Sequence, residues 1–403
     1  MAAFQKDEFK VMKVRDLYPE SGQSQTLYCD YCSEPMSLIF CLFDEVIEGI
    51  RLVVEDLPFL YCDCCCRKYL PDRSRIALID LHLSAWKTGN DRLYSKRQKR
   101  NDNFKFTDEI RFIYDPDDYY YIPGLSRSHD EGFLTPVFFR KTVLIRFDNS
   151  PEYAVSFGSK TYGQIYRGTE YGIPFGINKH NRVVMWLGDI ATLPLEEQHV
   201  LRGDNIESDH CVGSEFYDAQ IECKFTDSSP EESLIKARSK FHRTASARFG
   251  KRLSQLDQET LMLIQELKPP VTFTEKEVKN AIDILHKLNV ETLNSRNLEY
   301  LISERGKSVN KLGSLKKLER LLQQELSDQN ISFVLAPLFA LNNLRTMYFH
   351  MQSASKRQDR VKRVEQILEI ENDSPISKLY EVLLAKITNS YTELAELLFA
   401  PKD

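Results

Sequence analysis

The hydrophobic and polar positions along this chain change their spacing twice. Up to about residue 105, short apolar runs such as "SLIFCLF" and "RLVVEDL" are interspersed with clustered cysteines. From 106 to 228, aromatic and β-branched residues are broken by Gly, Pro, Asn and Asp, which is typical of short β-strands. From 229 onward, apolar residues recur three or four positions apart, which indicates amphipathic helices. The pattern predicts a multidomain α+β protein with a cysteine-rich module (1–105), a β-rich central domain (106–228) and an all-α bundle (229–403).

Four stretches of the central domain are predicted to form strands or strand pairs. Each combines aromatic or β-branched residues with turn-forming residues. Residues 178–181 are expected to connect two of these strands as a hairpin. The four stretches are "TPVFFRKTVLIRF", "YAVSFGSKTYG", "YGIPFGINKHNRVVMWLGDI" and "SEFYDAQIECKFT".

Helix-start signals mark the C-terminal domain. Ser229 followed by Pro230 supplies an N-cap and a proline at the first helical position, with a glutamate at the capping-box spacing. Thr274 and Glu277 form a second capping box, and the helix after it is expected to bury Val278, Ile282, Leu285 and Leu288. A last helix is expected after Ser374 and Pro375, with one apolar face made of Ile376, Leu379, Leu383, Ile387, Tyr391, Leu394 and Leu398.

The composition is that of an ordinary globular protein. The 403 residues are 42% hydrophobic and 28% charged, and the formal net charge is −5. This charge argues against a surface that coats nucleic acid indiscriminately, so any such binding must come from local basic patches. The chain begins without an apolar leader and has no apolar run of about 18 residues, so we expect a cytoplasmic protein that does not enter a membrane.

Seven of the nine cysteines lie in the first module, and four of them belong to a short sequence motif that occurs twice. The motif Tyr-Cys-Asp-x-Cys occurs as "YCDYC" and again as "YCDCC". Two C-x-x-C pairs supply the four thiolates that a tetrahedral zinc ion requires. The candidate metal ligands are therefore Cys29, Cys32, Cys62 and Cys65.

Such a zinc site would be structural, because four protein ligands leave no open position for water. The 29 residues between the pairs exceed the usual spacing, although a pair of strands could fill them. Cys64 and Cys66 flank the second motif, so the choice of ligands there stays open. The isolated cysteines are expected to be buried small hydrophobic residues: Cys41, Cys211 and Cys223.

Residues 341–350, "LNNLRTMYFH", place Arg345 and His350 five positions apart late in the helical domain. In this setting the stretch resembles the R-x4-6-H motif of HEPN-superfamily ribonucleases. Arg75 and His82 have a similar spacing, but they lie in the cysteine-rich module, where no bundle is expected. Many family members carry Asn, Asp or His after the arginine, whereas this chain has Thr346.

The resemblance implies a HEPN-like helical bundle and a metal-independent endoribonuclease that cleaves RNA by attack of the 2′-hydroxyl. Histidine titrates near neutral pH and can transfer a proton, so His350 is expected to do so. Arginine stays charged and its donors match phosphate oxygens, so Arg345 is expected to stabilise the phosphate. The resemblance also suggests an effector in antiphage defence (abortive infection) or a toxin, controlled by a phage-derived trigger or an antitoxin.

Helix geometry adds an expectation about oligomeric state. Five residues at 100° each leave the two side chains about 140° apart on a straight helix. They can then face one cleft only if the helix ends or distorts, or if a second copy contributes, and by resemblance we expect a homodimer. The basic run that follows is expected to bind the RNA backbone through Lys356, Arg357, Arg360, Lys362 and Arg363.

Two other functions remain possible from the residues alone. One is a non-enzymatic zinc-ribbon protein that binds nucleic acid or a partner and dimerises through its helices. The other is a metal-dependent nuclease that uses the central segment 195–216. This segment holds Glu196, Glu197, Asp204, Asp209, His210 and Glu215, for which turn and capping roles are the more frequent explanation.

Overall fold

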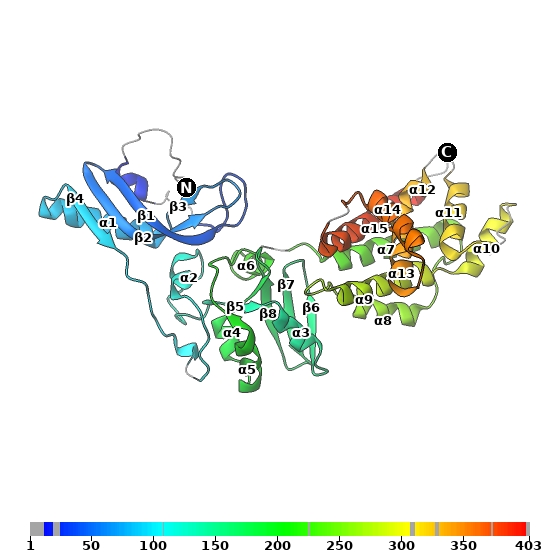
Figure 1. The fold of residues 1–403 in the computed structure, drawn as a ribbon, viewed down its shortest axis with the longest axis horizontal. Helices are drawn as coiled ribbons and strands as arrows, with labels where there is room; N and C mark the ends of the chain where they lie inside the picture. The colour runs from blue at the N-terminus through cyan, green and yellow to red at the C-terminus, as the bar shows by residue number, and fades with distance from the viewer. Residues whose placement is uncertain are drawn as a thin grey trace. The chain divides into compact units, whose positions relative to one another are not determined.

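The chain folds into two compact units, Met1–Asp227 and Ser228–Asp403. The computed structural model describes residues 12–18, 25–107, 109–224, 226–306, 311–326, 330–371 and 374–399. The architecture is mixed α/β: the first unit holds two sheets, and the elements of the second unit are helices (Figure 1). Within the described ranges, no helix combines the length and the apolar character needed to cross a bilayer.

The first sheet is built on a long antiparallel hairpin. Strands β1 (Ser37–Ile47) and β2 (Ile50–Tyr61) fill the sequence between the two cysteine motifs, as the spacing allowed. Strand β3 (Lys68–Tyr69) pairs antiparallel with β2, and β4 (Arg92–Lys96) pairs parallel with it. Helix α1 (Asp72–Thr88) packs on this sheet, and a short 3-10 turn, η1 (Val14–Leu17), lies beside it.

The second sheet has six strands in the order β10-β5-β9-β8-β7-β6, all paired antiparallel. The predicted hairpin is confirmed, because the chain turns at 178–181 between β8 and β9. The strands are β5 (Pro136–Arg140), β6 (Tyr153–Phe157), β7 (Tyr162–Arg167), β8 (Tyr171–Ile177), β9 (Arg182–Trp186) and β10 (Asn205–Ile206).

Part of the strand prediction for this region is wrong. The second half of "TPVFFRKTVLIRF" is helical, and "SEFYDAQ" begins another helix. The sheet is accompanied by a 3-10 turn, η2 (Lys105–Thr107), and by five helices. They are α2 (Pro116–Tyr121), α3 (Thr142–Asp148), α4 (Leu187–Ala191), α5 (Leu195–Asp204) and α6 (Glu215–Gln220).

Direct contacts join the two sheets into one unit. The backbone N–H of Leu38 on β1 donates to the carbonyl of His210 at 3.0 Å. The Tyr28 hydroxyl, next to the first cysteine motif, donates to Asp218 at 2.7 Å. An ion pair links Asp63, inside the second motif, to Lys179 of the β8–β9 hairpin. Residues of both cysteine motifs therefore contact the central region of the same unit.

The second unit begins where the capping signals predicted. The Ser229 hydroxyl accepts from the N–H of Glu232, and Thr274 and Glu277 make both bonds of a capping box. The helices are α7 (Pro230–Phe249), α8 (Asp257–Glu266), α9 (Glu275–His286), α10 (Ser295–Glu304), α11 (Ser314–Glu325), α12 (Ile331–Val334), α13 (Ala336–Phe349), α14 (Ala354–Leu368) and α15 (Ile376–Phe399). A π-helical turn, η3 (Lys287–Glu291), continues directly from α9.

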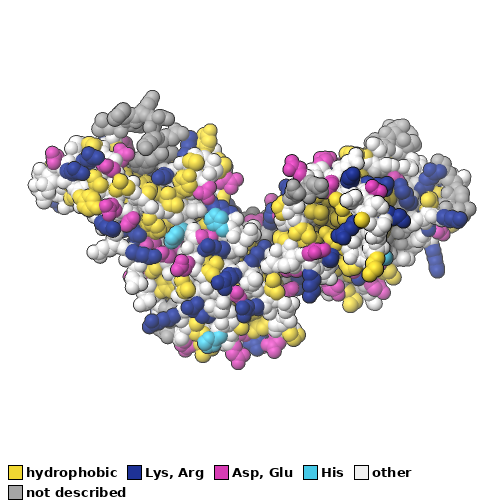
Figure 2. Space-filling model, viewed as in Figure 1, with side chains coloured by type: hydrophobic (Ala, Val, Ile, Leu, Met, Phe, Trp, Pro, Cys, Tyr) yellow, Lys and Arg dark blue, Asp and Glu magenta, His cyan; other side chains and the backbone are white. Residues whose placement is uncertain are grey.

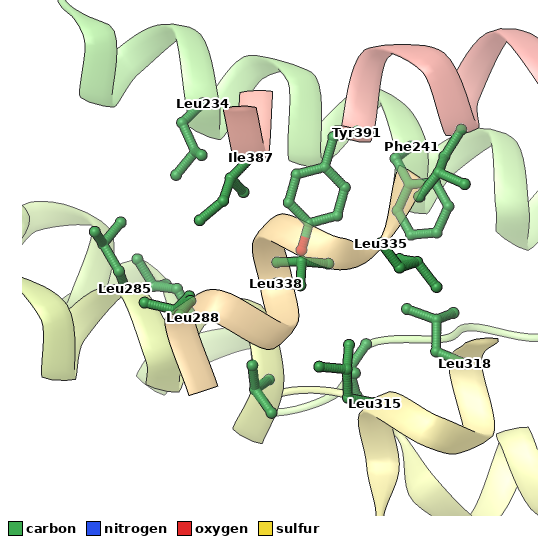
Figure 3. Packing of buried hydrophobic residues seen from close by; sticks show 14 of the residues in the cluster. Leu234, Phe241, Leu285, Leu288, Leu315, Leu318, Leu335, Leu338, Ile387 and Tyr391 are labelled. Carbon is green, nitrogen blue, oxygen red and sulfur yellow. The ribbon is translucent and has the colours of Figure 1, made fainter. Parts of the chain in front are cut away.

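The core of the second unit lies between α7, α9, α11, α13 and α15. Figure 3 shows the Tyr391 ring of α15 pointing toward Leu338 of α13, with Phe241 of α7 beside it. These side chains are almost completely buried, and burial raises the pKa of Tyr391 to about 12. This close packing fixes α13, whose C-terminal end carries Arg345 and His350.

Candidate functional site

The two cysteine motifs fold into matching turns. In each, the N–H four residues after the first cysteine donates to the carbonyl of that cysteine: Ser33 to Cys29 at 2.9 Å, and Cys66 to Cys62 at 2.8 Å. The donor residue is left-handed in both, with φ of 60° at Ser33 and 59° at Cys66. The repeated sequence therefore produces a repeated structure, with the cysteines of each pair on one side of the turn.

The sulfur atoms of the four predicted ligands converge. All four lie within 4.8 Å of one another, and the sulfurs of Cys29 and Cys65 are 3.5 Å apart. Those of Cys32 and Cys62 are 3.4 Å apart. A tetrahedral zinc ion with bonds of about 2.3 Å places its sulfurs about 3.8 Å apart, so these thiols fit a zinc ion with little adjustment.

The choice of ligands in the second motif follows from the turn. Cys66 occupies the left-handed position that Ser33 has in the first turn, and Cys64 corresponds to Tyr31. Both Cys64 and Cys66 are exposed and lie outside the converging group. Of the isolated cysteines, Cys211 is buried as predicted, Cys41 is half-buried, and Cys223 is exposed, so the prediction for Cys223 is wrong.

Arg345 and His350 meet at the end of α13. The helix stops at Phe349, and His350 is extended, with φ −121° and ψ 136°. Its side chain thereby turns back, and Nη1 of Arg345 donates to Nε2 of His350 at 2.8 Å. Guanidinium has no acceptor, so this bond leaves the imidazole proton on Nδ1. The expectation of side chains about 140° apart required a continuous helix, and the helix end brings them together within one chain.

Two acidic side chains lie close to Arg345. Its Nε is 3.7 Å from Asp283 of α9, and its Nη2 is 3.9 Å from Glu291 of η3. Asp283 also pairs with Lys287 at 2.8 Å, and this hydrogen bond raises the pKa of Lys287. The side chain of Arg345 is 28% exposed.

A second histidine, which sequence reasoning missed, contacts two residues that neighbour this pair. His286 is buried, its Nδ1 is 3.3 Å from Glu291, and its Nε2 is 3.1 Å from the side-chain oxygen of Asn342. An amide oxygen only accepts, so Nε2 of His286 carries the proton in this contact. The signal was present in the sequence, because His286 follows Ile282 by four positions on the apolar face of the capped helix. The π-helical turn then brings Glu291 toward Arg345, and such turns occur frequently at functional sites.

Each polar residue of the "LNNLR" motif makes a contact of its own. Leu341 and Leu344 are buried in the core, whereas Asn342 faces His286. Asn343 accepts a 2.7 Å hydrogen bond from Arg360 of α14. The hydroxyl of Thr346, which follows the arginine, donates to the carbonyl of Asn342 at 2.8 Å.

The five predicted RNA-binding residues all lie on α14. Arg360 is half-buried against α13, and the other four are exposed. At 100° per residue, Lys356, Arg360 and Arg363 fall within about 60° of one another around the helix, whereas Lys362 points away from them. In Figure 2, basic side chains are interleaved with hydrophobic ones on the visible face of the helical unit. Arg360 is the member of the set that the structure brings next to the Arg345 helix.

Three acidic residues of the central segment are held separately by protein donors. Glu197 accepts hydrogen bonds from Tyr153, Tyr171 and Arg167. Asp204 pairs with Arg146, and Asp209 with Asn178 and His180. Among the described residues, the four cysteines are the only group of three or more Cys, His, Asp or Glu whose ligand atoms converge.

His210, in the same segment, pairs with a different carboxylate. Its Nδ1 lies 2.7 Å from the fully buried Asp118, to which Ser208 also donates at 2.6 Å. Burial by itself would lower the pKa of His210, but the hydrogen bond to Asp118 and the negative charges of Asp118 and Asp115 together outweigh burial and raise this pKa. This pair stands at the junction of the two sheets, since the ring of Phe40 on β1 packs edge-on against His210.

The other arginine and histidine with a similar spacing have structural roles. Both lie on α1 and are buried: Arg75 donates to the carbonyl of Leu70 at 3.0 Å, and a ring nitrogen of His82 is 3.1 Å from the carbonyl of Ile47. Their side chains bond to backbone, whereas those of Arg345 and His350 bond to each other at the surface.

Comparison of the chain with known protein families, curated proteins and solved structures found no match.

Proposed function

We propose that the helical unit is a metal-independent endoribonuclease of HEPN type, with Arg345 and His350 as its catalytic residues. The observation that carries the proposal is the 2.8 Å contact between Arg345 Nη1 and His350 Nε2 at an exposed helix end. A cation and a titratable imidazole lie there side by side, which suits the two tasks of RNA cleavage: charge stabilisation on the phosphate and proton transfer.

The proposed reaction uses the nucleophile that RNA carries. His350 accepts the proton of the 2′-hydroxyl, the 2′-oxygen attacks the adjacent phosphorus, and the bond to the 5′-oxygen breaks. Solvent protonates the leaving 5′-oxygen, so the products are a 2′,3′-cyclic phosphate and a 5′-hydroxyl. Arg345 binds the phosphate oxygens as negative charge accumulates. When a phosphate takes the donors of Arg345, Nε2 of His350 is released to act as the base.

The surroundings of the pair favour a single-stranded RNA substrate. Phe349 is 47% exposed and Met351 is fully exposed, one on each side of His350 in the sequence. Exposed aromatic rings next to basic groups are suited to stacking unpaired bases. Arg360 extends the basic character from the pair onto α14.

The direct test is incubation of purified protein with total RNA in EDTA, with the zinc content measured before and after. Cleavage that leaves cyclic phosphate ends is expected, and His350→Ala or Arg345→Ala should reduce its rate by about 10²- to 10⁴-fold. Arg296→Ala is the matched control, since Arg296 is an exposed arginine on α10.

Each other outcome of this test would indicate a different function. Cleavage that EDTA abolishes without loss of zinc would favour a metal-dependent nuclease. RNA binding without cleavage, in the wild type and in both variants, would favour the non-enzymatic binding protein. Activity unchanged in His350→Ala would exclude this pair as the catalytic site.

We also propose that Cys29, Cys32, Cys62 and Cys65 hold a structural zinc ion. The support is the convergence of their sulfurs and the repeated turn that directs them. All four positions of a tetrahedral ion would be taken by protein, so the metal would stabilise the fold and leave chemistry to the helical unit.

Homodimerisation, and a role in antiphage defence or as a toxin with its trigger or antitoxin, belong to the same proposal and rest on the family resemblance. The angular argument for a dimer no longer applies, because one chain brings both side chains together. Light scattering of the purified protein across a concentration series would test the dimer.

A further inference from the structure

A loop of the first unit lines a half-open cavity of about 630 Å³ that neither candidate centre uses. The loop joins α2 to β5, and the cavity is lined on its apolar side by Leu125, Phe133 and Leu134. Leu125 and Leu134 are buried, so this side forms part of the packed fold. The volume falls within the range of small-molecule sites, which is about 300–1,000 Å³.

The polar side of the cavity offers several hydrogen-bond donors. Arg127, His129 and two serines line it. Among the described residues, neither the guanidinium of Arg127 nor the ring of His129 has a protein partner. The acid in the lining, Asp130, is paired with Lys105 at 3.1 Å.

Arg73 extends this positive character from α1. Its Nη2 donates to the hydroxyl of Ser126, one of the lining serines, at 3.0 Å. Its guanidinium carbon lies 4.7 Å from the ring centroid of Tyr120, and that of Arg100 lies 4.0 Å from the same centroid. Two guanidinium groups are thereby held around one tyrosine ring beside the cavity.

The loop is also held in place before any ligand arrives. The buried Tyr119 hydroxyl donates to the carbonyl of Arg127 at 3.1 Å and lies 3.0 Å from its N–H. These two contacts fix the backbone at the residue whose side chain is free to bind. A preformed site loses less conformational entropy when it binds.

We propose that this cavity binds a small phosphate ester of nucleotide size. The planar or apolar part would lie against Leu125, Phe133 and Leu134, and the phosphate would bind to Arg127, Arg73 and the serine hydroxyls. Guanidinium forks match phosphate oxygens better than they match a neutral ligand. The site lies in the first unit and is independent of the ribonuclease proposal. The protein would then have a small-molecule binding site separate from its proposed catalytic site.

The test is isothermal titration calorimetry on the full-length protein with four probes: AMP, ribose 5-phosphate, adenosine and inorganic phosphate. AMP is expected to bind most tightly, because it alone fills both sides of the cavity. Arg127→Gln and Arg73→Gln should each weaken AMP binding by about ten- to hundredfold, as the loss of a charged hydrogen bond would. Arg92→Gln, an exposed arginine on β4 of the same unit, should leave the affinity unchanged.

Thermal melts of each variant separate loss of a contact from loss of the fold. The proposal is overturned if none of the four probes binds the wild-type protein. It is also overturned if AMP binds equally well to a folded Arg127→Gln protein, or if binding requires a single-stranded oligonucleotide. Equal affinity for AMP and adenosine would contradict the phosphate contact.

Discussion

The cysteine cluster and the Arg345–His350 pair are the two candidate chemical centres, and they are held in different ways. The four sulfurs converge from two matching turns, and each turn is supported by its own backbone hydrogen bonds. Such a set of four sulfurs would fill every position of a tetrahedral metal ion. The Arg345–His350 pair lies at a helix end, where the arginine side chain is 28% exposed and the imidazole proton lies away from the contact. In our proposal, the first centre stabilises the fold and the second one carries out the reaction.

The largest expected effect is the loss of a cysteine ligand. Cys62→Ser should release the metal and unfold the first sheet, because structural zinc binding contributes about 10–16 kcal/mol in small zinc domains. Zinc content by atomic absorption and limited proteolysis between the cysteine module and the central sheet would measure this. Retention of one zinc ion per chain with an unchanged melt would contradict the structural role.

Loss of the imidazole should separate activity from stability. His350→Ala is expected to lower the cleavage rate by about 10²- to 10⁴-fold while shifting the free energy of unfolding by less than about 0.5 kcal/mol, because the side chain is exposed. Denaturant titration alongside the cleavage assay measures both quantities. Loss of stability together with activity would mean that the helix end is a structural feature, like the cysteine turns.

A smaller effect is expected where the acidic neighbours compete with RNA for Arg345. Glu291→Gln removes a charge 3.9 Å from the guanidinium, so RNA affinity should rise by about two- to fivefold at low salt. Filter binding over a salt series would measure it, with Glu396→Gln, an exposed glutamate of α15, as the control. Weaker binding or slower cleavage would show instead that Glu291 positions Arg345 and His286.

The smallest effect is expected at the cysteines that the turn geometry places outside the cluster. Cys64→Ser should leave the zinc content unchanged and alter the free energy of unfolding by less than about 0.5 kcal/mol. Cys65→Ser, one position later, should behave as Cys62→Ser does. Zinc loss in Cys64→Ser would mean that the ligand set differs from the converging one.

Local signals in the sequence predicted much of this structure. The hydroxyl caps at Ser229 and Thr274 and the hairpin at 178–181 are confirmed, because each depends on residues within a few positions. The pairing of the two cysteine motifs is also present, because a repeated sequence folds into a repeated turn.

Two short stretches rich in aromatic and β-branched residues were predicted to be strands but are helices. In α3, Val143, Leu144 and Phe147 are buried with a helical spacing, although valine, isoleucine and phenylalanine favour strands. In α6, Phe216 and Tyr217 are buried next to each other, and six residues are too few for a period to be recognised. Contacts with the sheet outweighed local propensity in both helices.

By itself, the sequence determined the candidate metal ligands, the starts of the capped helices and the presence of an arginine and a histidine in the last third of the chain. The tertiary structure decided that α13 ends at Phe349, so that Arg345 and His350 touch. It also brought Glu291 near Arg345, and His286 against Asn342 and Glu291. The physical reason is distance along the chain: His286 meets Asn342 across 56 positions, and only the packing of α9, η3 and α13 brings them together.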